Sequence, residues 1–151
     1  MKKSINIWSF VGKTNREAMA LAKEAGFEGI ELALDAAGEI SAEATDEQLQ
    51  ALKDYAQELG IRIPSLSSSL CWGDSLTSDD PAERQRAHDM VVQQIRCAKA
   101  LGAETVLVVP GSVSVEFVPE RPVIAYDVAY DRALEEIKKL VPVAEEYGVE
   151  I

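Results

Sequence analysis

The chain has no apolar run that approaches the roughly 20 residues needed to cross a membrane. Its opening residues, MKKSINIWSF, turn polar at Asn6 and Ser9, so we expect no export signal. The two cysteines, Cys71 and Cys97, lie far apart and form no CxxC pair, which favours neither a disulfide framework nor a zinc ribbon. These absences predict a protein of the reduced cytoplasm with no membrane partner.

Positive charge is also scarce in this sequence. The 15 Lys and Arg residues stand against 26 Asp and Glu residues, which gives a formal net charge of −11. A field of that sign repels phosphate backbones, so nucleic acid is a poor candidate partner. Solubility alone is the simplest explanation of the acidity.

Nucleotide motifs and histidines are missing as well. No G-x-G-x-x-G follows the first expected strand, which disfavours a Rossmann cofactor site. Gly12, Lys13 and Thr14 resemble the end of a phosphate-binding P-loop, but Ile7 stands where that motif needs its first glycine. We therefore interpret Thr14 as a helix cap. His88 is the only histidine, and we expect it at the surface or boundary of a helix.

The sequence does contain a repeated pattern of helix ends. Four helical stretches stop at a glycine, and a short apolar run rich in β-formers follows each one. The resulting order of strand, helix, strand, helix predicts an α/β fold with a parallel sheet. We expect strands at residues 4–10, 28–34, 61–66 and 104–110, and helix ends at Gly26, Gly60, Gly102 and Gly148.

Capping signals indicate where the helices begin. Thr14 and Glu17 have the spacing of a capping box, and so do Thr45 and Gln48. A third helix should follow Asp80 and Pro81, and a fourth should begin near Asp127, with a kink at Pro142. The fourth helix is supported by an apolar stripe formed by Tyr130, Leu134, Ile137, Val141, Ala144 and Tyr147.

Long loops follow the third and fourth expected strands, whereas short connections follow the helices. In βα folds the loops at the carboxyl ends of the strands build the active site. Aromatic rings, hydroxyls and a carboxylate gather at these ends, and such a mixture suits a sugar. A structural interpretation stays open, in which the rings belong to the core and the carboxylate pairs with a cation. The candidate substrate-binding residues are Trp8, Glu31, Ser67, Trp72 and Gly111.

Several stretches resemble a known family. They are AGFEGIEL, LCWGDSLTSDDPAERQRA, AKALGAETVLVVPG and YDVAYDRALEEIKKLVPVAEEYGVEI. The family is the sugar-phosphate isomerase/epimerase group with a xylose-isomerase-like barrel, and the similarity is greatest to its ketose 3-epimerases. The resemblance implies a TIM (β/α)8 barrel. Residues 1–151 would be a truncated N-terminal half of this single domain, with four βα units and the start of strand five.

The resemblance also implies a divalent metal, commonly manganese, in the full-length protein. In the family its ligands are a glutamate at the end of strand five and an aspartate, a histidine and a glutamate from strands six to eight. None of these is expected within residues 1–151, and Glu150 lies too early in its strand to be the first. We therefore expect no metal ligand and no catalytic residue in this chain. Related apurinic endonucleases bind metal through histidines near the positions of Ser67 and Gly111. This chain lacks those histidines and is acidic, so a function in DNA repair is disfavoured.

These expectations combine into one functional hypothesis and two alternatives. We expect the N-terminal portion of a metal-dependent sugar or sugar-phosphate isomerase or epimerase, which works through an enediolate and is inactive as this piece alone. One alternative is a non-catalytic half-barrel scaffold that forms homo-oligomers, because an open sheet exposes its edges and an apolar face. The other is a complete flavodoxin-type domain, for which Ile151 would have to be a true end.

Overall fold

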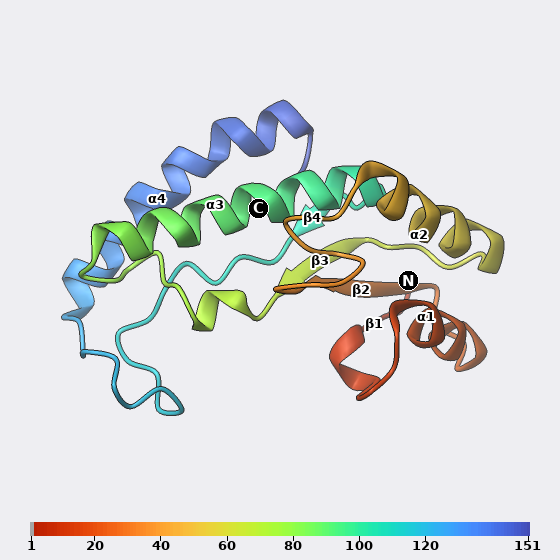
Figure 1. Cartoon of the computed structure of the whole chain (residues 1–151), viewed down its shortest axis with the longest axis horizontal. Coiled ribbons are helices and arrows are strands. Elements are labelled where there is room, and N and C mark those ends of the chain that lie inside the picture. Colours follow the sequence, from red (N-terminus) through yellow and green to blue (C-terminus); the bar gives the residue numbers. More distant parts are fainter. Residues whose placement is uncertain (1) are drawn as a thin grey trace.

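The computed structural model describes residues 2–151 and confirms the alternating α/β fold (Figure 1). One parallel sheet contains four strands in the order β1-β2-β3-β4. The strands are β1 (Ser4–Asn6), β2 (Gly29–Leu34), β3 (Ser65–Ser68) and β4 (Thr105–Val106). The α-helices are α1 (Asn15–Glu24), α2 (Asp46–Leu59), α3 (Pro81–Leu101) and α4 (Tyr126–Tyr147), and two short 3-10 helices are η1 (Ile7–Ser9) and η2 (Leu70–Trp72).

The helix boundaries follow the local signals in the sequence. Thr14 and Glu17 form the expected capping box, with the Thr14 amide donating to Glu17 Oε2 at 2.9 Å and the Glu17 amide donating to Thr14 Oγ1 at 3.3 Å. Thr45 and Gln48 repeat this arrangement at the start of α2. At the other ends the backbone adopts positive φ angles between 65° and 83°, at Gly26, Gly60, Gly102 and Gly148.

The helices pack side by side against one face of the sheet (Figure 1). Consecutive parallel strands with right-handed crossovers place every connecting helix on the same side. Accordingly α1 contacts α2, α2 contacts α3, and α3 contacts α4. The core between the layers is formed by Ile30, Leu32, Leu34 and Leu66 from the sheet and by Met19, Leu49, Leu52 and Ile95 from the helices.

The opposite face of the sheet carries polar side chains. Side chains alternate along a strand, so the neighbours of the helix-facing residues Leu32 and Leu66 point the other way. The strand register places Asn6 beside Glu31, Ala33 beside Ser67, and Ser65 beside Thr105. This second face has no helical cover within residues 2–151, and we call it the open face.

β1 and β4 are much shorter than the sequence predicts, and β3 spans Ser65–Ser68 instead of residues 61–66. Residues 4–10 do not form one strand, because the Asn6 side chain accepts the Trp8 amide at 2.8 Å and starts η1. Trp8 therefore lies in a 3-10 helix instead of closing β1. Residues 104–110 contribute only two residues to the ladder, and Leu107 remains 48% exposed. Most of the expected strand 104–110 is therefore loop.

The buried face of α4 also differs from the expected stripe. Tyr130, Leu134 and Val141 are 56%, 42% and 41% exposed, although all three belong to the apolar stripe. The helix instead turns a neighbouring face toward α3, the helix against which it packs most extensively. It runs from Tyr126 to Tyr147 without a break at Pro142. The residues that α4 buries are Ala129, Glu136, Leu140 and Ala144.

The chain returns to the sheet after α4. The Val106 amide donates to Glu150 O at 2.8 Å, and the Glu150 amide donates to Glu104 O at 2.9 Å. This parallel bridge next to Thr105 is the expected start of a fifth strand. Within residues 2–151 no helix has both the length and the apolarity that a membrane crossing requires.

Candidate functional site

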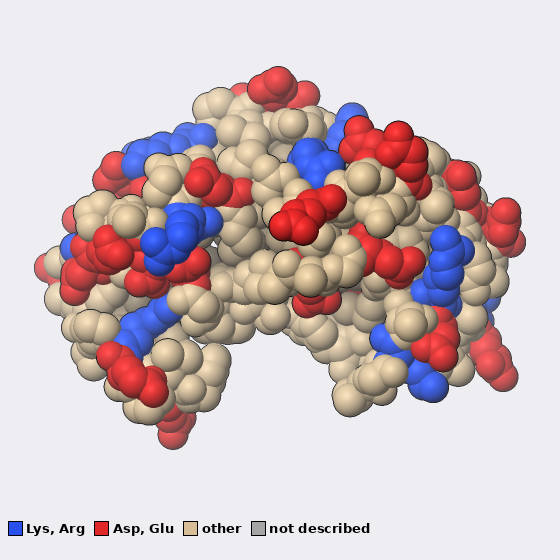
Figure 2. Space-filling model, viewed as in Figure 1, with Lys and Arg blue, Asp and Glu red and all other residues tan. Residues whose placement is uncertain are grey.

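The strand carboxyl ends and the loops that follow them border a hollow in the molecule. Figure 2 shows this hollow at the lower edge of the view, between two lobes. The left lobe contains the β4–α4 loop (residues 107–125), and the right lobe contains η1 and the turn into α1 (Figure 1). Hydrogen bonds hold the β3–α3 loop (residues 69–80) against the β4–α4 loop.

A polar cluster occupies the open face of the sheet. The Glu31 carboxylate accepts the Ser65 hydroxyl at 2.8 Å through Oε1 and the Asn6 amide through Oε2. Asn6 Nδ2 also lies 3.5 Å from Ser67 Oγ, and Ser67 donates to Leu32 O at 3.2 Å. The partners of Glu31 are therefore a neutral amide and a neutral hydroxyl, where the structural interpretation expected a cation. This arrangement holds the carboxylate in one orientation inside the sheet layer.

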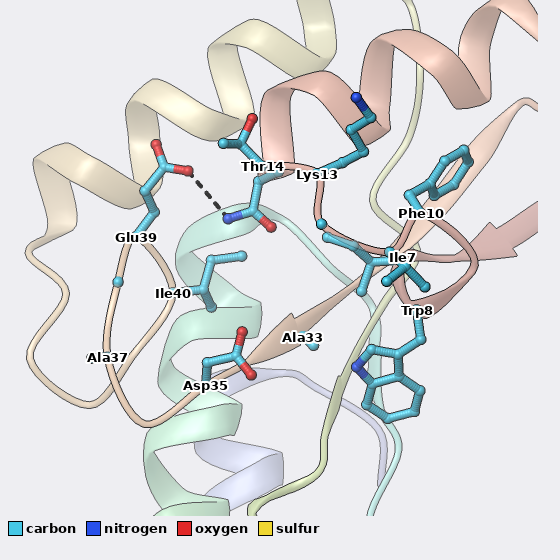
Figure 3. A pocket seen from close by; sticks show the side chains of 14 residues that line it. Ile7, Trp8, Phe10, Lys13, Thr14, Ala33, Asp35, Ala37, Glu39 and Ile40 are labelled. Atoms are coloured by element: carbon cyan, nitrogen blue, oxygen red, sulfur yellow. Dashed lines mark hydrogen bonds between the residues drawn. The ribbon is translucent and has the colours of Figure 1, made fainter.

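A cavity of about 470 Å³ lies at the carboxyl ends of β1 and β2. Figure 3 shows Trp8 and the Asp35 carboxylate facing this space from two sides, while the Lys13 amine points away from Asp35. Trp8 is 50% exposed, and partial burial raises the pKa of the Asp35 carboxyl. On the rim Asn15 Nδ2 donates to Glu39 Oε2 at 3.2 Å. An indole face and a hydrogen-bond acceptor are thus available to one ligand.

The two long loops are joined close to the strand ends. The Thr77 hydroxyl donates to Ser112 O at 3.0 Å and accepts the Ser112 amide at 3.1 Å. Gly111 has a φ of 142°, and a Cβ there would lie 2.1 Å from Thr77 Cγ2. Only glycine fits this backbone conformation and this close approach. Gly111 therefore allows the loops to meet, and it supplies no side chain to a ligand.

An aromatic pair stands farther out on the same two loops. The rings of Trp72 and Phe117 meet edge to face, with centroids 5.4 Å apart and planes at 76°. Trp72 is 37% exposed and Phe117 is 69% exposed, so the pair presents apolar ring surface to solvent. Each loop contributes one ring, and the surface exists only while the loops stay in register.

The five residues selected from the sequence lie at three places. Trp8 lines the 470 Å³ cavity, Glu31 and Ser67 belong to the polar cluster inside the sheet layer, and Trp72 and Gly111 lie in the joined loops. All are on the open face or at the carboxyl ends of the strands. Their assignment to a substrate remains a prediction.

Sequence reasoning missed several residues of this region. Asn6 had a usable signal, because period-two alternation in the first strand places it on the same face as its neighbour Glu31. Asp35 also had one, because it directly follows the expected strand 28–34. Thr77, Phe117 and Arg121 had no local signal, since their partners come from segments far along the chain. The residues missed are Asn6, Asp35, Thr77, Phe117 and Arg121.

The described residues do not offer a donor set for a divalent cation. Within residues 2–151 no three His, Cys, Asp or Glu side chains gather as metal ligands would. His88 lies between α3 and α4, with Nδ1 3.3 Å from Glu136 Oε2 and a side chain that is 16% exposed. This is the boundary position on a helix that the sequence predicts, remote from the strand ends.

The sequence profile of the xylose isomerase-like TIM barrel family matches residues 19–151. The chain belongs to this family. Four parallel strands, four covering helices and the start of a fifth strand correspond to half of such a barrel. No protein of curated function matches the chain.

Solved structures with the same fold include three ketose 3-epimerases. A D-psicose 3-epimerase studied with D-fructose has a TM-score of 0.79 at 19% identity and pairs 99% of this chain with 50% of its own. The Clostridium cellulolyticum H10 D-psicose 3-epimerase with D-tagatose has a TM-score of 0.78 at 19% identity, and the match covers 99% of this chain and 50% of that structure. An L-ribulose 3-epimerase has a TM-score of 0.75 at 21% identity, and the match covers 99% of this chain and 48% of that structure. The chain spans about half the length of these structures, and at such identities the likeness shows the fold.

Proposed function

We propose that this chain is part of a sugar or sugar-phosphate isomerase or epimerase of the ketose 3-epimerase kind, and that residues 2–151 supply one wall of its substrate site. The observation that carries the proposal is the placement of exposed rings and fixed polar groups on one side of the sheet. Trp8 and Trp72 are exposed at strand carboxyl ends, and the partly exposed Glu31 is held on the open face next to Ser67, which is itself fully buried. In barrels of this type the carboxyl-end loops bind the substrate.

The chemistry of these groups suits a sugar. The C–H faces of a sugar stack on an indole ring, and its hydroxyls need acceptors and donors at fixed positions. Trp8 and Asp35 supply a ring and an acceptor around the 470 Å³ cavity. Trp72 and Phe117 supply a second apolar surface across the hollow. We assign binding and orientation of the sugar to these side chains, and none of them a proton transfer.

The divalent metal implied by the resemblance finds no ligand set within residues 2–151. If the enzyme uses one, side chains elsewhere in the full-length protein hold it. We assign proton transfer next to the ketose carbonyl to side chains outside residues 2–151 as well. The chain described here therefore binds and orients without performing the chemical step.

The full-length protein with added manganese is the preparation that tests this proposal. A panel of ketoses and ketose phosphates should yield one epimerised or isomerised product, detected by chromatography. Trp8→Ala should raise KM about tenfold with a smaller effect on kcat, because a stacking surface contributes about equally before and during the reaction. Val11→Ala is the matched control, since Val11 lines the same cavity but is 92% exposed. Absence of turnover on the whole panel would refute the proposal.

Self-association of a half-barrel scaffold remains the second candidate. It is favoured by the exposed Leu107 on the open face and by the exposed apolar residues of α4. Turnover by the full-length protein would argue against a purely structural role.

A further inference from the structure

Arg121 of the β4–α4 loop reaches into the β3–α3 loop. Its side chain is only 12% exposed, and its Nη2 lies 3.2 Å from Glu83 Oε1. The same nitrogen donates to Trp72 O at 3.3 Å and to Gly73 O. One guanidinium therefore connects the first turn of α3 with the backbone carbonyls of two consecutive residues, Trp72 and Gly73.

Glu83 is held in place from the other side. Its Oε1 accepts the Ser75 amide at 3.0 Å, and its Oε2 accepts the Ser78 hydroxyl at 2.7 Å. Glu83 is the third residue of α3, where a negative charge also interacts favourably with the helix dipole. A partly buried, charge-assisted contact of this kind restricts both side chains, because each would lose a charged partner if the other moved.

The rings carried by these loops depend on that contact. Trp72 supplies one of the carbonyls that Arg121 binds, and Phe117, which packs edge to face on Trp72, precedes Arg121 in the same loop. Closer to the strands, Thr77 and Ser112 fix the loops by two further hydrogen bonds. Without Arg121 the outer part of the β4–α4 loop would lose its hydrogen bonds to the Trp72 and Gly73 carbonyls.

We propose that Arg121 is a positioning residue that sets the Trp72 backbone against the β4–α4 loop, so that Trp72 and Phe117 form one preorganised aromatic wall for the sugar. This inference rests on the proposed function and extends it to a residue that touches no substrate. A preassembled wall binds its ligand more tightly, because the loops lose less conformational freedom on binding.

The test compares Arg121→Gln with Arg132→Gln in the full-length protein. Arg132 is the matched control, because it also binds the β3–α3 loop, at Thr77 O (3.0 Å) and Asp79 Oδ1 (2.7 Å), but makes no contact with the Trp72 carbonyl. For Arg121→Gln we expect KM for the ketose to rise about tenfold with kcat within about twofold. Arg121→Lys should recover part of the loss, since it keeps the charge but not the planar fork. Arg132→Gln should leave KM unchanged.

Two further readouts separate positioning from simple stabilisation. The near-ultraviolet circular dichroism of Arg121→Gln should change in the same bands as that of Trp72→Phe, without any sugar present. Adding Trp72→Ala to Arg121→Gln should raise KM no further than Trp72→Ala alone, because both changes remove the same wall. Additive effects, or a lower melting temperature with unchanged KM and dichroism, would overturn the inference. If the wild type turns over no ketose, the proposed function fails, and the dichroism alone decides whether Arg121 positions Trp72.

Discussion

At the scale of single residues, Gly111 and Gln94 shape the backbone where β4 ends and the β4–α4 loop begins. Gly111 brings the β4–α4 loop within contact of Thr77, where a side chain has no room. Gln94 of α3 is almost fully buried, and its Nε2 donates to Leu66 O at 2.8 Å and to Leu107 O at 3.1 Å. The Leu107 amide donates to the same Leu66 O at 3.0 Å, so the Gln94 side chain adds to the backbone bond that joins β3 to the residue after β4.

Gly111→Ala should destabilise the protein through two separate effects. Its φ of 142° is unfavourable for any L side chain, and the new Cβ would overlap with Thr77. We expect the free energy of unfolding to fall by about 2–4 kcal/mol in urea titrations. Gly38→Ala is the control, because its φ is 108° but nothing lies within 4 Å of the added Cβ. An equal loss for both variants would mean that the contact with Thr77 is unimportant.

Gln94→Leu should be costly although the two side chains have similar volumes. The change removes the amide that donates to both carbonyls and places an apolar group against them. Leu66 O keeps the Leu107 amide as a donor, so we expect a loss of about 1–3 kcal/mol of unfolding free energy. Gln57→Leu, at an exposed position of α2, should change stability by less than about 0.5 kcal/mol. Equal stabilities of wild type and Gln94→Leu would contradict this account of the β4 end.

At the scale of the element, helix starts and stops follow from short stretches of sequence. α1 and α2 begin with the same capping box, but Glu17 occupies its third position in α1 and Gln48 does so in α2. The backbone amide of Thr14, with its hydroxyl as a second donor, lowers the pKa of the Glu17 carboxyl below its ordinary 4.5. The capping box of α1 therefore contains a titratable carboxyl, whereas the box of α2 contains a neutral amide.

This difference predicts that the stability contributed by the α1 box depends on pH, and that substitutions can move this dependence to the α2 box. A carboxyl with a lowered pKa in the folded state stabilises the protein above its unfolded pKa, and this contribution is lost as the pH falls through the lowered value. Wild type should therefore be more stable than Glu17→Gln near neutral pH, and the difference should vanish in acid. The reciprocal variant Gln48→Glu should acquire the same dependence in α2. Urea midpoints measured between neutral pH and about pH 3 would test both, and a constant difference would refute the assignment.

At the scale of the whole molecule, the arrangement is half of a (β/α)8 barrel with an open inner face. β1 has an unpaired outer edge, and the outer edge of β4 pairs only with Glu150 within residues 2–151. Leu107 on the inner side and several apolar residues of α4 remain exposed. In closed barrels such surfaces are covered by the remaining strands and helices.

Residues 1–151 produced alone should therefore self-associate. Exposed strand edges and apolar surface favour pairing with another copy, so we expect a concentration-dependent shift to dimers or larger species in analytical ultracentrifugation. Leu107→Lys should weaken the association, because it places a charge on the open face. Glu58→Lys, which also introduces a lysine but at an exposed position of α2, is the control. A compact monomer at all concentrations would contradict this view of the open face.

The local chemistry of the chain was enough to predict much of the fold. Capping residues, helix-ending glycines and apolar runs act within a few residues, so the sequence by itself determines where the helices lie, the alternation with strands and the family resemblance. These signals also directed attention to the strand carboxyl ends, where Trp8 and Trp72 are exposed.

Only the tertiary structure decided which side chains meet there. The Asn6–Glu31, Thr77–Ser112 and Arg121–Trp72 contacts join residues between 25 and 49 positions apart. The exposed face of α4 and the early end of β1 likewise depend on which neighbours are present and on one side-chain hydrogen bond. Sequence patterns report a residue's preference for burial or for a backbone shape, whereas its partner is set by how distant segments pack.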